Sequence, residues 1–332
     1  MSSDAAIDEF WRYWTANAAA IESAIHDRTL GDFIEPLSER VRGIDPGLDW
    51  EFGKGRVAEH YFCLAPKGDS RLRIVTERWR VRGPGDGSVF EFHAARPGGG
   101  YVDSQALDFG EAVFEFSKFR AALKPDEGRE RVDVAIYHPA FANVVDKLRA
   151  TASFITLDAM LGEDDVERFV GTVDFETTEP EGARTLDALV EAVDAMRAQA
   201  TGERFVLLEW TNAEGRRGFA LINRALKRID HLGFDTHFEV VVPLRSPNAE
   251  GLPGQAEADE LNALEDELVA SLGPHAVNLG RTTTEGLRKI LFFAASTGES
   301  AIAFDAFARR HVARGVEVHG TADPQWNAAA GY

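Results

Sequence analysis

Residues 237–244, HFEVVVPL, form an apolar, β-branched run of the length of one strand. Turn-forming residues follow from 246 to 254, so the strand must end there. Between 256 and 272, leucine and valine recur every three or four residues among acidic ones, which is typical of a helix with one buried face. Gly273 and Pro274 end this helix, because glycine accepts a left-handed cap and proline cannot continue the helix.

The remaining residues continue the pattern with two strands, a helix and a strand. The strands are predicted at about 276–282 and 288–294, with a turn at 284–286 between them. A second amphipathic helix at about 301–312 and a closing strand at 316–319 complete the order βαββαβ. That order predicts a ferredoxin-like unit, in which an antiparallel sheet of strand order 4-1-3-2 carries both helices on one face.

The N-terminal part shows the same succession of signals. They are, in order, a helix at 30–41, strands at 48–52 and 60–65, a helix at 70–82 and a strand at 89–93. We therefore predict an α+β protein with duplicated ferredoxin-like (αββαβ) units, whose antiparallel sheets are covered by helices. The alternative is two unrelated α+β halves that share turn chemistry by chance.

The domain boundary is predicted at Glu179-Pro180-Glu181-Gly182, the most linker-like stretch. This divides the chain into an N-terminal domain, 1–180, with the repeat unit 30–97, and a C-terminal ferredoxin-like domain, 181–332. Residues from about 108 to 179 equally fit an elaboration of the first sheet. In that segment we expect a strand at 132–137, a short helix at 141–148 and a second strand at 154–161.

Separated motifs in the C-terminal third carry a family resemblance. They are Gly251-Leu252-Pro253, the acidic leucine-rich helix after it, TTEGLR at 283–288 and DPQW at 323–326. Together they resemble the bacterial domain of unknown function 695 family over residues 205–326. The resemblance implies a fold and a bacterial setting but no reaction. Family members tend to have a tyrosine soon after the tryptophan, whereas an alanine-rich tail separates Trp326 from Tyr332 here. Through RGVEV at 314–318, the unit is also similar to the acidic domain that inhibits ribonuclease E.

Composition limits the class of partner. The 332 residues are 44% hydrophobic, which is ample for two packed domains. A formal charge of −19 argues against nucleic-acid binding, because phosphates need clustered cations. Acidity suits solubility or a basic protein partner.

Cysteine use and hydropathy indicate the compartment. The single Cys63 lies in the apolar stretch YFCL, where we expect a buried thiol, and it cannot form an internal disulfide. A reducing cytoplasm fits best. No uninterrupted apolar run reaches the length of a membrane-spanning helix, and the acidic N-terminus does not resemble a secretory signal.

Catalytic and cofactor motifs are not apparent in the sequence. It contains no Gly-x-Ser-x-Gly elbow, no Walker loop and no metalloprotease pair. Asp230, His231, Asp235 and His237 cluster, but without the spacing of zinc ligands, so we expect no metal site and no cofactor.

The most distinctive polar residues lie at the final hairpin and after the last strand. The candidate binding residues are Arg281, Thr283, Glu285, Arg288, Asp323 and Trp326. A structural role fits them too, since an arginine pairs with a neighbouring carboxylate and a tryptophan covers a sheet edge. In the predicted strand order the two groups need not meet.

Three functions fit these observations. The leading hypothesis is a non-catalytic binding or regulatory protein that presents sheet edges and acidic helices to another protein. The rival is a hydrolase or transferase with a site in the cleft between the two repeats, where folding would assemble histidines and carboxylates. The third is immunity against a basic toxin or nuclease. The sequence names neither the partner nor the oligomeric state.

Overall fold

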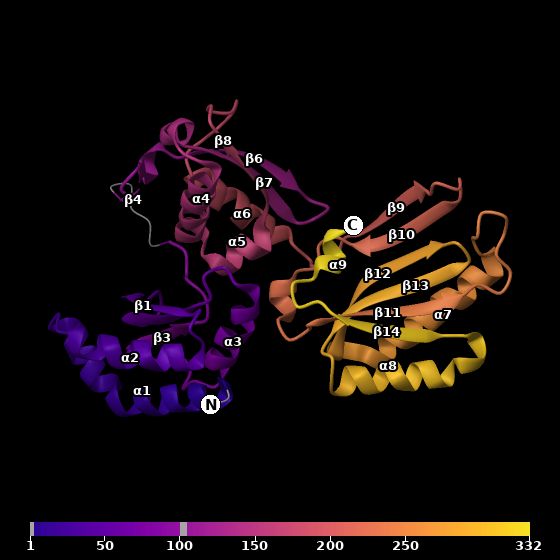
Figure 1. Cartoon of the computed structure of the whole chain (residues 1–332), viewed down its shortest axis with the longest axis horizontal. Helices are drawn as coiled ribbons and strands as arrows, with labels where there is room; N and C mark the ends of the chain where they lie inside the picture. The colour runs from indigo at the N-terminus through magenta and orange to yellow at the C-terminus, as the bar shows by residue number, and fades with distance from the viewer. Residues whose placement is uncertain (1–2, 100–104) are drawn as a thin grey trace. The chain divides into compact units, whose positions relative to one another are not determined.

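The computed structural model describes residues 3–99 and 105–332. The chain divides into two compact units. The first comprises the residues up to Leu123 together with Asp133–Ala192, and the second comprises Lys124–Val132 together with Val193–Tyr332. Both contain helices and antiparallel strand pairs, so the predicted α+β class is confirmed (Figure 1).

Three small sheets and six α-helices occupy the chain up to Gln199 within the described residues. Their α-helices are α1 (Ser3–His26), α2 (Gly31–Ile44), α3 (Ser70–Val81), α4 (Asp146–Leu161), α5 (Glu163–Phe169) and α6 (Asp187–Gln199). The strands are β1 (Asp49–Lys54), β2 (His60–Ala65), β3 (Phe90–His93), β4 (Ala106–Asp108), β5 (Val113–Glu115), β6 (Arg120–Asp126), β7 (Arg131–Tyr137) and β8 (Val170–Glu176). They pair as β1-β2-β3, β4-β5 and β6-β7-β8.

The aromatic face of α1 builds the N-terminal core. Trp11 and Trp14 are buried, and the Trp11 ring stacks on Trp79 of α3 with centroids 4.7 Å apart. The Trp11 indole N–H donates to the Trp79 carbonyl at 2.7 Å, so its one polar atom is satisfied inside the core. Cys63 is fully buried, as expected, and burial raises the pKa of its thiol.

The N-terminal sheet corrects the prediction of an antiparallel repeat. β1 and β2 are antiparallel, but β2 and β3 pair in parallel. Parallel pairing follows from the α3 crossover that joins them. In the C-terminal sheet another strand lies between the two strands that correspond to β2 and β3. The N-terminal unit begins with helix α1 instead of such a strand, so β3 lies directly beside β2. The expected duplication is thus not confirmed.

The prediction for the central segment was also wrong. Residues 154–161, predicted as a strand, belong to helix α4, and the short helix expected at 141–148 is a 3-10 turn, Pro139–Asn143, followed by the start of α4. The buried residues of α4 recur every three or four positions. Phe154 and Ile155 are exposed, so the apolar run FITL does not mark a buried strand.

The second unit is built around one six-stranded antiparallel sheet. Its elements are β9 (Phe205–Thr211), β10 (Arg217–Asn223), β11 (Thr236–Pro243), α7 (Gln255–Leu272), β12 (Ala276–Thr284), β13 (Leu287–Ala294), α8 (Glu299–Arg310), β14 (Glu317–Ala322) and α9 (Asn327–Ala330). The order is β14-β11-β13-β12-β10-β9. The last four strands in sequence thus have the predicted 4-1-3-2 order, and the hairpin of β9 with β10 adds two strands beyond β12.

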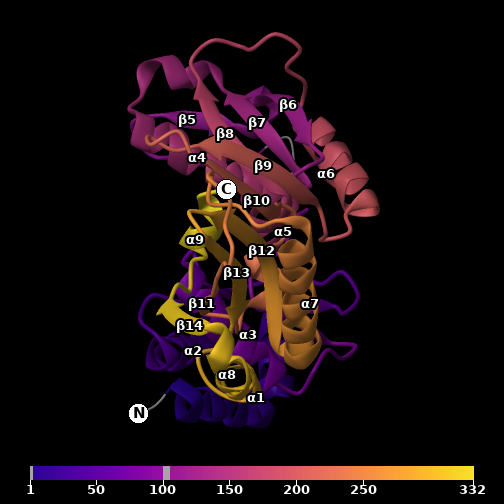
Figure 2. The same ribbon diagram turned by 90° about the vertical axis from the view of Figure 1, so that its right-hand side faces the viewer.

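The two faces of this sheet are covered differently. Helices α7 and α8 lie together on one face (Figure 2), where Leu261, Leu268 and Phe304 pack against the central strands. The other face carries a smaller cluster around Phe293 and Trp326, closed by α9. Among the described residues, no helix is both long and apolar enough to cross a bilayer.

Candidate functional site

The predicted binding residues fall in three separate places. Arg281, Thr283 and Arg288 gather beneath α7, Glu285 lies in the β12–β13 turn, and Asp323 and Trp326 lie on the opposite face of the sheet.

The group beneath α7 joins the helix to the sheet. The Arg281 guanidinium lies 2.9 Å from the buried Glu265 carboxylate of α7. Arg288 donates to the Thr283 hydroxyl at 2.8 Å and to the Asn262 side-chain oxygen at 3.0 Å. Burial, and then repulsion from Arg281, lowers the pKa of Arg288, whereas attraction to Glu265 opposes that change. One carboxylate therefore offsets the positive charge of two guanidinium groups beneath α7. The role of these charges is structural, since they join the helix to the sheet.

Glu285 lies where two of the family motifs meet. Its backbone is left-handed, with φ 51°, and its carboxylate accepts from the Asn212 side chain at 2.8 Å. The next residue, Gly286, donates its N–H to the Gly251 carbonyl at 2.9 Å. Gly251 also has positive φ, and a Cβ there would lie 2.9 Å from the Glu285 Cα. The Gly-Leu-Pro loop therefore fits the turn only with glycine at 251.

Asp323 and Trp326 fix the C-terminal end of the chain. The Asp323 carboxylate accepts from the backbone N–H groups of Asn327 and Ala328, at 2.9 and 2.8 Å. The Trp326 ring stacks on Phe293 at 4.0 Å, and its N–H donates to the Phe234 carbonyl at 2.7 Å. Both side chains are buried, so the DPQW motif closes this face of the sheet.

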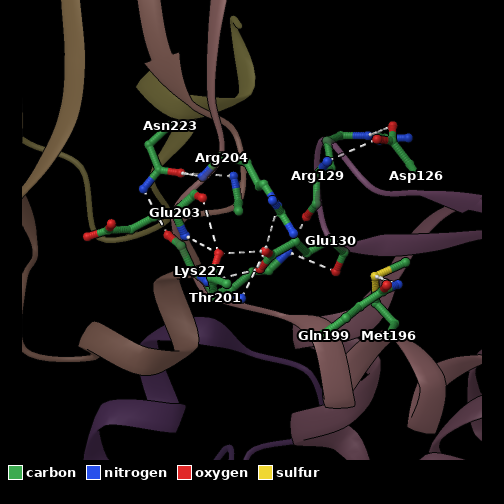
Figure 3. A network of polar contacts seen from close by, with 12 residues as sticks. Asp126, Arg129, Glu130, Met196, Gln199, Thr201, Glu203, Arg204, Asn223 and Lys227 are labelled. Atoms are coloured by element: carbon green, nitrogen blue, oxygen red, sulfur yellow. Dashed lines mark hydrogen bonds and ion pairs between the residues drawn. The ribbon is translucent and has the colours of Figure 1, made fainter.

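A network that sequence reasoning missed surrounds Glu130 (Figure 3). The buried Glu130 carboxylate accepts from the Thr201 N–H at 2.9 Å, the Thr201 hydroxyl at 3.0 Å, the Gly202 N–H at 3.0 Å and Arg204 Nε at 3.2 Å. Burial opposes ionisation of Glu130, but these hydrogen bonds outweigh it and lower the pKa. The carboxylate thereby attaches the β6–β7 turn to the segment before β9. No spacing in the sequence links positions so far apart.

Lys227 lies in the same network. Its amino group donates to the Arg129 and Glu130 carbonyls, at 2.5 and 3.3 Å. Burial, and then repulsion from Arg131, lowers the pKa of Lys227 to about 7. A lysine with such a pKa is able to act as a nucleophile when a substrate reaches it. Here two backbone carbonyls already accept hydrogen bonds from the buried amine, so Lys227 stabilises the β6–β7 turn.

Two acids in the first unit have raised pKa values. Burial, and then repulsion from Asp158, raises the pKa of Glu163 to about 7, and burial raises that of Asp158 to about 6. Arg96, 4.0 Å from Glu163, opposes both shifts but donates instead to Glu51 at 3.0 Å. Glu163 Oε2 is buried without a hydrogen-bond partner in the described part of the chain. A surface hollow elsewhere in this unit, lined in part by Glu9, Glu39 and Arg40, contains neither acid.

Three of the exposed large apolar side chains of the second unit lie on edge strand β9. Phe205, Leu207 and Trp210 are 48%, 66% and 37% exposed. Within the described residues β9 pairs only with β10, so its other side presents free backbone donors and acceptors. The opposite edge, β14, presents Glu317, His319 and Thr321 to solvent. The sequence at 205–210, FVLLEW, is an apolar run, but nothing in it shows that the strand lies at a sheet edge.

Residues 211–329 match the model of a family described as "Family of unknown function (DUF695)". This confirms the resemblance to that family inferred from the motifs of the C-terminal third, whereas the likeness to the ribonuclease E inhibitor domain stays a prediction. The same segment contains the α7 group, the Gly251–Glu285 junction and the Asp323 and Trp326 closure. No curated protein and no solved structure matched the chain.

Proposed function

We propose that this chain, whose C-terminal part matches a family with no assigned activity, is a non-catalytic protein-binding module. Its partner contributes an extended segment that pairs with edge strand β9. The observation that carries the proposal is the difference between the two edges of the six-stranded sheet.

An unprotected apolar edge is a ready template for another strand. Proteins usually protect edges with charged side chains, proline or a covering helix. β14 presents Glu317 and His319 and no large apolar side chain to solvent, whereas β9 reads FVLLEWT and exposes Phe205, Leu207 and Trp210 beside its one charged residue, Glu209. Strand addition supplies backbone hydrogen bonds, and exposed apolar side chains supply affinity and selectivity.

The charge of the chain indicates what kind of segment binds. With a net charge of −19, the molecule attracts basic segments over a long range and repels acidic ones. The bound segment is therefore expected to combine apolar residues, which meet Phe205 and Leu207, with lysine or arginine.

Selection from a phage-displayed library of random peptides tests the proposal. We expect the selected peptides to alternate apolar and basic residues and to slow amide hydrogen exchange in 205–211. Leu207→Lys adds a charge at the exposed edge and should weaken binding by more than about tenfold, because an unpaired charge there opposes strand addition. The measurement is the dissociation constant by fluorescence anisotropy.

Thr321→Lys is the matched control, since it adds the same charge to the exposed opposite edge. It should bind the peptides as the parent chain does. Equal loss in both variants, or protection of amides elsewhere than 205–211, would contradict binding at β9. Sedimentation of the parent chain alone identifies the case in which a second copy occupies the edge.

A second function, hydrolysis or group transfer, is supported by one observation. Glu163 has a pKa of about 7, which suits a general acid near neutral pH. Loss of a hydrolytic activity in Glu163→Gln, with peptide binding at β9 retained, would favour this function over the first.

A further inference from the structure

The ligand-bearing side chains of His26, Glu59 and His60 converge at one place in the first unit. Their nitrogen and carboxylate oxygen atoms all lie within 4.8 Å of one another. His26 is the last residue of α1, and His60 is the first residue of β2. Glu59 lies in the bend before β2, so the alternation of side chains along a strand does not separate it from His60.

The distances fit a metal ion shared by three donors. His26 Nε2 lies 3.2 Å from Glu59 Oε1, and His60 Nε2 lies 3.8 Å from the same oxygen. Around a tetrahedral ion with bonds of about 2.0–2.1 Å, neighbouring donor atoms are roughly 3.3 Å apart. Small side-chain rotations therefore bring all three atoms to bonding distance.

His60 supplies an independent observation. Its Nε2 is buried, yet has no hydrogen-bond partner among the residues that the structure describes. A buried imidazole nitrogen without a partner costs free energy unless something outside the chain satisfies it. The ring is held by packing on Phe90, with centroids 5.7 Å apart, so it cannot easily turn toward another partner.

Backbone hydrogen bonds also hold the three ligands in position. The His60 N–H donates to the Val89 carbonyl at 2.9 Å, and the Glu59 N–H donates to the Ser88 carbonyl at 3.0 Å. Beyond the end of α1, the Thr29 N–H returns to the Ala24 carbonyl at 2.8 Å and fixes the turn after His26. The backbone at or beside each donor is therefore fixed by hydrogen bonds.

We propose that His26, Glu59 and His60 bind a divalent first-row transition metal ion, of which Zn²⁺ is the representative. Two imidazoles and one carboxylate suit zinc, cobalt or iron rather than magnesium or calcium, which prefer oxygen ligands. With three protein ligands, the ion keeps at least one position for water. The sequence hid this site, because His26 lies far along the chain from the adjacent Glu59 and His60.

Metal titration of the full chain, freed of metal with a chelator, tests the proposal. We expect one Zn²⁺ per chain by calorimetry and a visible absorption band from tetrahedral Co²⁺ at the same stoichiometry. His60→Gln, His26→Gln and Glu59→Gln should each weaken Zn²⁺ binding by at least about tenfold, since loss even of an outer-shell partner costs that much. Glu59 and His26 are half exposed, so their variants keep the fold even if His60→Gln perturbs it.

His275→Gln is the matched control. His275 lies 2.7 Å from Glu299, and both side chains are exposed, but no second histidine completes a cluster there among the described residues. This variant should bind Zn²⁺ as the parent chain does. Unchanged affinity in the His26 and Glu59 variants, or absence of stoichiometric binding in the parent chain, would overturn the proposal. Binding of Mg²⁺ as tight as that of Zn²⁺ would also contradict the assigned ligand chemistry.

Discussion

Glu163 carries a proton at pH values where an ordinary glutamate has lost it. Its side chain is only 9% exposed, and Arg96 lies 4.0 Å away, too far for a close ion pair. Because burial dominates, the uncharged acid is the favoured form in the folded chain, and the pKa rises from 4.5 to about 7. Glu130 shows the opposite outcome, since hydrogen bonds to its buried carboxylate lower the pKa. The difference lies in the number of donors that each carboxylate meets.

Glu163→Gln should therefore change the dependence of stability on pH. Between pH 4.5 and about 7 the folded chain keeps the Glu163 proton while the unfolded chain loses it, so the free energy of unfolding falls as pH rises through this window. Glutamine cannot ionise and removes that fall. We expect the variant to be more stable than the parent by about 2 to 3 kcal/mol near pH 8 and nearly equal to it below about pH 5.

Urea denaturation at both pH values measures this difference. Glu181→Gln, at an exposed site, is the control and should match the parent at both. A constant difference between Glu163→Gln and the parent across the pH range would show that the effect comes from packing and not from ionisation.

At the scale of elements, α7 is held to the sheet both by leucines and by one carboxylate. The Glu265 carboxylate lies 2.9 Å from the Arg281 guanidinium and also attracts that of Arg288. We expect Glu265→Gln to cost about 2 to 3 kcal/mol, because it leaves buried positive charge without a counter-charge. Arg288→Met should cost no more than about 1 kcal/mol, since it removes the costly buried charge and keeps the volume. Thermal and urea unfolding of the two variants check the order, and a larger loss in Arg288→Met would contradict it.

Local pattern was sufficient for the elements of the C-terminal third and insufficient elsewhere. Each signal there lies within a few residues of the strand, helix end or turn that it determines. These signals are the run at 237–244, the caps at Gly273 and Pro274 and the hairpin turn at Glu285, and the 4-1-3-2 order followed from them. The run FITL of α4 could form a helix or a strand, depending on which of its faces packs against a neighbour. A short apolar run does not specify that face. Likewise, similar αββαβ signals give different sheets, because the presence of β11 decides which strands are adjacent.

The candidate sites show the same limit. Sequence singled out residues with conspicuous chemistry, such as Arg288 and Trp326, and the structure gives these residues internal partners. The exposed edge at Leu207 and the convergence of His26 with His60 depend on pairing between distant segments. Composition and periodicity do not show which distant segments pair, so neither the exposed edge nor the histidine cluster could be predicted.

At the scale of the whole molecule, the net charge of −19 makes salt act in two opposite directions. Like charges repel one another in the compact state, whereas exposed ion pairs contribute at most about 1 kcal/mol each. Raising NaCl from about 0.02 M to about 0.5 M shortens the Debye length to a few ångströms, which removes the long-range repulsion. We therefore expect the melting temperature at neutral pH to rise with salt. Near the isoelectric point, about pH 4.9, the repulsion vanishes, and the same salt should leave the melting temperature unchanged or lower it.

The same salt series should weaken binding of a basic peptide to β9, because screening removes the attraction that steers it to an acidic chain. Stability and affinity would then change in opposite directions in one titration, followed by scanning fluorimetry and by anisotropy. A peptide of equal apolar content with its basic residues replaced by serine is the control and should lose little affinity. If salt weakened both peptides equally, the apolar edge and not the charge would account for partner choice. If salt lowered the melting temperature at neutral pH, the surface ion pairs would outweigh the net repulsion.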